Sequence, residues 1–247
     1  MTSKVTTQII CPLVLTTMWL TSGCGLNQPA SQPDSGPLGR VAESKANLPL
    51  NERFLSPPVE LYDLEAKAGI ISDSIIKENW WQAQADLTGL LTIWEQAKPL
   101  VGEQKGIKEA DEAITKLSQA LVDKSVTAAY ENLNKFMSAV ADLGKLYKLS
   151  PLTDIISVDN SLRSLNYFVE DKNWRKAEAK AKELENVWNH SKPSLEKLGI
   201  LNEIKRMNGL DNQIKDSVKA ENKNSFTDQA AKANESLGRI RDYYRNR

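Results

Sequence analysis

The chain has 247 residues and carries 32 basic and 32 acidic side chains, so its formal net charge is zero. A balanced charge argues against nucleic-acid binding, which requires a strongly basic face. The composition is rich in Ala, Leu, Lys and Glu and low in Gly, and no strand-like alternation of any length occurs. Both observations predict an all-α fold.

Residues 1–23 have the features of a signal peptide. Lys4 gives a short basic start, residues 9–20 are apolar, and residues 20–24 read as a cleavage site that ends at Cys24. The apolar run is shorter than the about 20 residues that a transmembrane helix needs. The segment resembles the lipobox of bacterial lipoproteins, which implies that Cys24 is lipidated and becomes the mature N-terminus. We therefore expect a lipid anchor on the extracytoplasmic face of the cell membrane, with ordinary secretion as the alternative.

The segment after Cys24 is expected to be a tether. Residues 24–54 contain four prolines among Ser, Gly, Gln and Asn and have little apolar content, so disorder is predicted. The other cysteine, Cys11, lies within the signal peptide. The mature chain therefore forms no internal disulfide, and a hydrophobic core must stabilise it.

The rest of the chain contains a tandem duplication, because one stretch recurs 94 positions later without a gap. The recurring elements are Asn79-Trp80 with Asn173-Trp174, Trp94 with Trp188, Lys98-Pro99 with Lys192-Pro193, and Leu55-Ser56-Pro57 with Leu149-Ser150-Pro151. We predict one helical repeat over residues 55–148 and a second over residues 149–247.

Each copy contains four stripes of apolar residues spaced three and four apart, the pattern of one helix face. The stripes cover residues 61–75, 80–94, 107–121 and 129–147 in the first copy, and 155–169, 174–188, 201–218 and 226–244 in the second. This rhythm is typical of helix bundles. We predict two tandem up-down-up-down four-helix repeats of about 94 residues, or alternatively one continuous helical array.

Several residues predict helix ends. Ser-Pro at 56–57 and 150–151 suits a cap followed by a first helical residue. Asn79 and Asn173 suit caps, and Gln82 could complete a capping box. Proline at 99 and 193 should stop or kink the second helix of each copy. Asn208-Gly209 should break or bend the third helix of the second copy.

The Asn-Trp step carries a second resemblance. Asn79-Trp80, Ala83 and Trp94, repeated as Asn173-Trp174, Ala177 and Trp188, resemble an uncharacterised extracytoplasmic helical domain of Gram-positive, spore-forming bacteria. The likeness covers about residues 55–242. It implies a location outside the cytoplasm and brings no assigned activity.

The repeated tryptophans are expected to lie in the core. Trp80 and Trp94 are 14 residues apart, which places them within about 40° of each other on one helix face. Trp174 and Trp188 repeat this placement. Trp81 lies about 100° from the stripe, and Arg175 replaces it in the second copy. These two residues are the candidates for contact with a partner.

The sequence shows no recognisable catalytic, cofactor or metal motif. His190 is the one histidine, and Val187 and Pro193 stand three residues on either side of it, so neither Glu-x-x-His nor His-x-x-Glu is formed. The basic C-terminus suits a helix dipole, or alternatively contact with anionic lipid or a cell-wall polymer. Its residues are Arg239, Arg241, Arg245 and Arg247, with Tyr243 and Tyr244.

We expect a non-catalytic interaction or structural module at the cell envelope, with no cofactor, no metal and no nucleic acid. Its expected partners are the membrane, through the lipid, and an envelope protein. The alternative is a lipoprotein that binds a small ligand or an ion.

Cys24→Ala should release the protein from membranes, because the variant lacks the thiol that carries the lipid. Fractionation of cells labelled with radioactive palmitate measures this: the wild type should be labelled and sediment with membranes. An unprocessed variant in the membrane pellet would show instead that the signal peptide acts as an uncleaved anchor.

Overall fold

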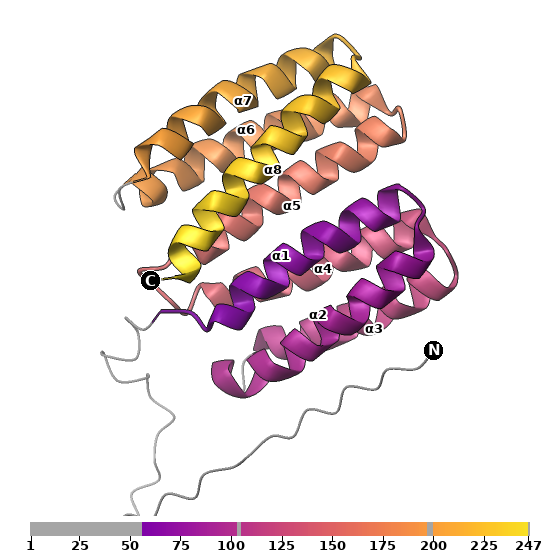
Figure 1. The fold of residues 1–247 in the computed structure, drawn as a ribbon, viewed down its shortest axis with the longest axis vertical. Coiled ribbons are helices and arrows are strands. Elements are labelled where there is room, and N and C mark those ends of the chain that lie inside the picture. Colours follow the sequence, from indigo (N-terminus) through magenta and orange to yellow (C-terminus); the bar gives the residue numbers. More distant parts are fainter. Residues whose placement is uncertain (1–55, 103–104, 197–199, 247) are drawn as a thin grey trace, which may run out of the picture. The chain divides into compact units, whose positions relative to one another are not determined.

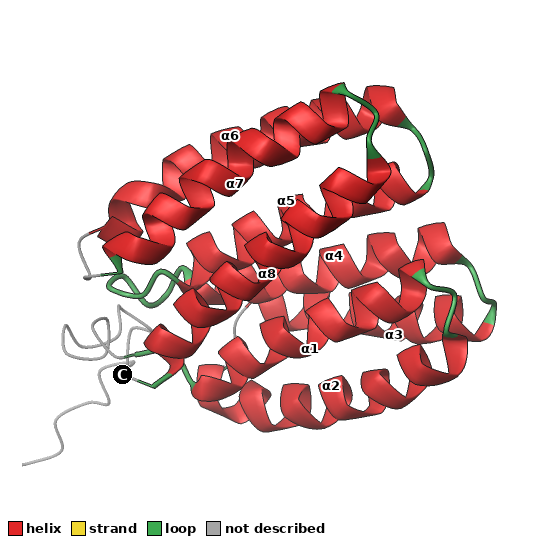
Figure 2. Cartoon of the chain, turned by 45° about the horizontal axis from the view of Figure 1, so that its top comes forward, coloured by secondary structure: helices red, strands yellow, loops and turns green. Residues whose placement is uncertain are grey.

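The computed structural model describes residues 56–102, 105–196 and 200–246. This part of the chain forms eight α-helices and no strand, which confirms the all-α prediction (Figures 1 and 2). The helices are α1 (Val59–Ile76), α2 (Trp80–Val101), α3 (Lys105–Val122), α4 (Val126–Gly144), α5 (Leu152–Glu170), α6 (Trp174–Glu196), α7 (Leu201–Lys219) and α8 (Lys223–Arg245). None of these described helices is long and apolar enough to cross a membrane. The predicted signal peptide, Cys24 and the tether lie outside the described residues.

The helices pack as two quartets, α1–α4 and α5–α8, that share an interface. In the first quartet α1 packs against α2 and α4, and α3 packs against both of these; α5 to α8 repeat the arrangement. Across the interface α5 packs against α1 and α4, and α8 packs against α1 (Figure 1). All eight described helices belong to one compact unit. The contacts therefore fit the alternative of a continuous helical array, and they do not divide the chain into two independent bundles.

Four helix hairpins use the same turn. In each, the residue before the N-cap has a left-handed backbone, with φ between 51° and 54°; these residues are Glu78, Lys124, Lys172 and Glu221. The next residue donates its backbone N–H to a carbonyl five residues back, as in Asn79 to Ser74 at 2.9 Å. Its side chain then accepts a backbone N–H of the following helix, as predicted for Asn79 and Asn173.

The remaining end signals were placed wrongly. Helix α1 begins after Pro58 and α5 after Pro151, so neither Ser56 nor Ser150 directly precedes its helix, but Ser150 Oγ still accepts the backbone N–H of Leu152 at 3.1 Å. Gln82 donates its side-chain N–H to Asp86 at 2.7 Å and so forms no capping box.

The two prolines do not end their helices at once, and Asn208-Gly209 does not break its helix. Pro99 and Pro193 lie inside α2 and α6, which continue to Val101 and Glu196. Asn208-Gly209 lies inside an unbroken α7.

The buried tryptophans connect the second and third helices of each copy. Trp94 Nε1 donates to Asp111 Oδ1 at 2.7 Å, and Trp188 Nε1 donates to Asn208 Oδ1 at 2.8 Å. Asn208 follows Asp111 by 97 positions rather than 94, so the second copy has three additional residues between Pro193 and Asn208. With this shift the two contacts are equivalent. Asn208 therefore has a packing role where the sequence suggested a break.

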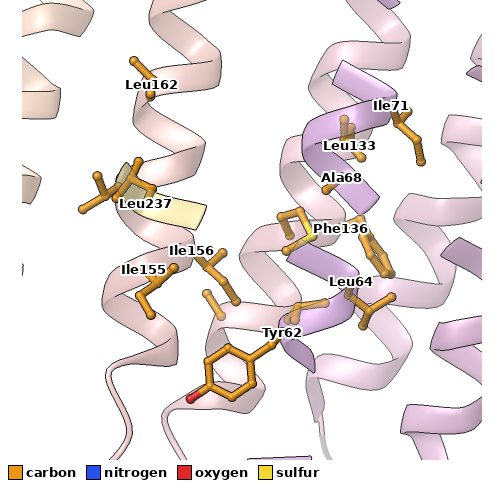
Figure 3. Packing of buried hydrophobic residues seen from close by; sticks show 14 of the residues in the cluster. Tyr62, Leu64, Ala68, Ile71, Leu133, Phe136, Ile155, Ile156, Leu162 and Leu237 are labelled. Atoms are coloured by element: carbon orange, nitrogen blue, oxygen red, sulfur yellow. The ribbon is translucent and has the colours of Figure 1, made fainter. Parts of the chain in front are cut away.

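The core is continuous across both quartets. Trp94 and Trp188 are fully buried, and Trp94 meets the ring of Phe136 edge to face, with 5.6 Å between centroids. Trp80 and Trp174 are only partly buried and pack on the margin of this core. Side chains such as Tyr62 of α1 and Ile156 of α5 extend the core to the shared interface (Figure 3).

Trp94→Ala and Trp188→Ala should each lower the free energy of unfolding by about 3–5 kcal/mol, because truncating a buried tryptophan leaves a cavity. Trp81→Ala is the matched control: its side chain is exposed, so the change should stay within about 0.5 kcal/mol. Urea titration followed by circular dichroism measures all three. Equal midpoints for Trp94→Ala and the wild type would contradict the assignment of Trp94 to the core.

Candidate functional site

A pair of buried acids lies where the two quartets meet. Glu65 of α1 is 2% exposed and Asp159 of α5 is 6% exposed. Asp159 follows Glu65 by 94 positions, so the duplication places an acid at the same point of both copies. Glu65 follows Leu61 by four residues and thus lies on the buried face of α1. The two carboxyl groups are hydrogen-bonded to each other.

Two arginines from the second quartet neutralise this pair. Arg241 Nη1 of α8 donates to Glu65 Oε2 at 2.8 Å, and Arg163 Nη1 of α5 lies 3.5 Å from Glu65 Oε1. Arg163 Nη2 also donates to Asn160 Oδ1 at 2.5 Å. The carboxylate of Glu65 on α1 therefore contacts both α5 and α8.

The acids differ in protonation. Burial raises the pKa of Asp159 well above its ordinary value, and the neighbouring charge of Glu65 raises it further. Burial also acts to raise the pKa of Glu65, but the hydrogen bond from Asp159 and the charges of Arg163 and Arg241 outweigh burial and lower this pKa. The opposite directions of the two pKa shifts favour a proton on Asp159 and the negative charge on Glu65, which is the acid in contact with both arginines.

Both arginines stand where the first copy has glycine. Arg163 corresponds to Gly69 at the 94-residue offset, and Arg241 corresponds to Gly144 at the 97-residue offset. A Cβ atom at Gly144 would lie 2.8 Å from Thr153 Oγ1, which itself donates to Ala141 O at 2.9 Å. Gly144 therefore permits a close approach of α4 to α5.

The corresponding junction of α8 with α1 is held by ion pairs instead. Arg245 donates to both carboxylate oxygens of Asp63 at 2.6 and 3.0 Å, in addition to the Arg241–Glu65 contact. The arginines near the C-terminus thus join the two quartets, a role that neither the dipole nor the polymer expectation included. Arg239 instead pairs with Glu203 of α7.

A polar cavity of about 180 Å³ lies between α1, α5 and α8 beside the acid pair. Its polar lining includes Glu65, Ser72, Asp73, Asp159, Arg163, Asn166, Asn234 and Arg241. Arg163 Nε and Ser72 Oγ are buried and have no hydrogen-bond partner among the described residues. A Cβ atom at Gly69 would meet no atom within 4 Å, so space is open along this part of the wall.

The predicted contact residues lie elsewhere, on the outer faces of α2 and α6. Trp81 is 77% exposed and Val122 is 61% exposed. Both lie at the same end of the first quartet, where Gln84 Nε2 donates to Leu121 O at 3.3 Å.

The second copy has a different surface at this place. Arg175 and Lys219 stand at the positions of Trp81 and Val122, and they line a groove of about 480 Å³ between α6 and α7. Lys182 and Lys215 add positive charge to this groove, and Glu178 and Glu185 add negative charge. The core is thus repeated, while the outer face changes from apolar to charged.

No cluster of three or more His, Cys, Asp or Glu side chains suited to a metal ion occurs in the described ranges. The chain matches no family model, no curated protein and no solved structure in the comparisons with known proteins. The resemblance of the Asn-Trp step to an extracytoplasmic helical domain stays a prediction.

The sequence pattern did not predict a role for the buried acid pair or for the arginines that contact it. A lone acid among apolar residues looks like the solvated edge of an amphipathic helix. The signal that could have found it was the recurrence of an acid at the same stripe position, Glu65 and Asp159, in both copies.

Isosteric changes at the two acids should shift stability differently. Glu65→Gln removes the charge that Arg163 and Arg241 require, so the free energy of unfolding should fall by about 3–5 kcal/mol at pH 7. Asp159→Asn preserves a donor to Glu65 and imitates the protonated acid, so the variant should be at least as stable as the wild type at pH 7.

The pH dependence follows from the direction of each pKa shift. Because the pKa of Asp159 is raised by folding, its contribution to stability is lost as pH rises from its ordinary value of 3.8 toward the folded-state value. Asp159→Asn lacks this loss, so its advantage should shrink toward pH 4. Because the pKa of Glu65 is lowered, its contribution is lost as pH falls below 4.5. Urea titrations between pH 4 and 9 measure these differences, and equal losses for both variants at pH 7 would contradict the assignment.

Proposed function

We propose that this protein is a lipid-anchored, extracytoplasmic helical protein that acts as a non-catalytic interaction module at the cell envelope. The observation that carries the proposal is the divergence of the two outer faces on a repeated core. Trp81 and Val122 make one face apolar, whereas Arg175 and Lys219 make the other charged.

The exposure of Trp81 supports a binding role for the first face. A tryptophan left 77% exposed forgoes most of the stabilisation that burial would bring. Tryptophan is also the residue type most enriched among interface residues whose truncation weakens binding. Because Trp80 is already anchored on the core beside it, Trp81 is free to contact a partner.

The buried and paired acids fit a structural or binding role better than turnover. Glu65 and Asp159 are buried, and the ionised Glu65 is paired with two arginines. A second candidate function, capture of a small ligand, is favoured by the polar cavity beside this pair.

A photo-reactive residue at position 81 tests the interaction role in intact cells. Substituting p-benzoylphenylalanine for Trp81 should yield a specific protein adduct after irradiation. The matched control is the same substitution at Thr92, which is exposed on α2, about three turns further along the same face.

The protein found in the adduct should then co-purify with the wild type and not with Trp81→Ala. Identical adducts at positions 81 and 92, or equal co-purification with Trp81→Ala, would contradict the assignment of this face as the contact surface.

A further inference from the structure

The cavity between α1, α5 and α8 has hydrogen-bonding capacity that the described part of the protein does not use. Arg163 and Ser72 are 7% and 2% exposed, and both line the cavity. Arg163 Nε and Ser72 Oγ have no partner within the described ranges. Buried polar atoms in native proteins are nearly always hydrogen-bonded, and an occupant that carries acceptor oxygens would satisfy both of these atoms.

The charge at the base of the cavity also favours a negatively charged group. Glu65 gives its shorter contact to Arg241, at 2.8 Å, and lies 3.5 Å from Arg163. Burial and the neighbouring Glu65 raise the pKa of Asp159 well above its ordinary value, so Asp159 is a poorer counter-ion for Arg163 than Glu65 is. Arg163 is therefore only loosely neutralised, and a carboxylate could accept from its Nε–H and from the Ser72 hydroxyl together.

The lining of the cavity also carries a negative charge, that of Asp73. Asp73 is exposed to solvent and lines the cavity, so it marks the open side. Asn166 and Asn234 add amide groups to the wall. A simple anion would be repelled by Asp73, whereas a ligand with a cationic group at its other end would complement both charges.

The volume limits the ligand to a small molecule. A cavity of about 180 Å³ corresponds to roughly six water molecules at about 30 Å³ each. Alanine and serine are small enough to fit within this volume.

We propose that this cavity binds a small zwitterion of the α-amino-acid class, with its carboxylate on Arg163 Nε and Ser72 Oγ and its ammonium group toward Asp73. The arginine is present in the second copy alone, because Gly69 stands at its position in the first. The duplicated chain therefore has this arginine-containing site once, because the two copies diverged at this position. The site is independent of the outer face around Trp81.

Isothermal titration calorimetry on the full chain in detergent tests the proposal. The probes are alanine, serine, lactate and ethylamine, and the last two each lack one of the charged groups. Alanine or serine should bind at one site per chain, and lactate and ethylamine should bind at least about tenfold more weakly, because each loses a charge-assisted contact. Arg163→Gln should weaken amino-acid binding by a similar factor.

A cavity-filling variant separates loss of the site from loss of the fold. Gly69→Leu adds a side chain where no atom lies within 4 Å, removes no charge and improves helix propensity, so binding should disappear while the melting temperature holds or rises. Gly209→Leu is the matched control, because a Cβ atom at Gly209 on the exposed face of α7 also meets nothing within 4 Å. This control should bind like the wild type.

The outcomes decide the proposal. No heat of binding with alanine or serine at about 10 mM would overturn it, since affinity that weak reflects no built site. Lactate binding as tightly as alanine would overturn the zwitterion assignment. Unchanged binding in Gly69→Leu would place the ligand outside this cavity and would likewise overturn it.

Discussion

The contact on which the array depends is the buried carboxylate of Glu65 between two arginines. Transferring a charge from water to a protein interior costs several kcal/mol unless it is paired there. Arg163 of α5 and Arg241 of α8 provide that pairing, so the two helices must lie against α1 for the charge to be tolerated. The requirement links both quartets in one direction and register, which apolar packing alone specifies less strictly.

The duplication explains why the interface between the quartets is polar, and also why its α4–α5 and α8–α1 contacts differ. Each copy contributes one acid, Glu65 or Asp159, and two like charges at close range favour sharing a proton. The first copy has glycine where the second has its arginines, and Gly144 lets α4 approach α5 closely. On the other side the longer side chains of Arg241 and Arg245 reach across from α8 to α1. The polar cavity lies on this second side, between α1, α5 and α8.

The repeated tryptophans show how a core tolerates a change in chain length. Three additional residues lie between Pro193 and Asn208 in the second copy. Asn208 nevertheless accepts a hydrogen bond from the indole N–H of Trp188, as Asp111 does from that of Trp94. The insertion is absorbed outside the contact. A buried indole N–H needs an acceptor, and an amide oxygen serves in place of a carboxylate. The outer faces carry no such requirement, which is consistent with the contrast between Trp81 and Arg175.

The sequence by itself determined the helices, the stripes that carry Trp94 and Trp188, and the caps at Asn79 and Asn173, because periodicity and capping are local properties of a few consecutive residues. It did not predict that Pro58 and Pro151 directly precede their helices or that α2 continues past Pro99. It also suggested a break at Asn208, where the contact with Trp188 lies inside an unbroken helix. Only the tertiary structure brought Glu65, Asp159, Arg163 and Arg241 together, since Glu65 and Arg241 are 176 positions apart. Whether an acid on an apolar stripe meets water or an arginine depends on which helix covers it, and that is a property of the assembled array.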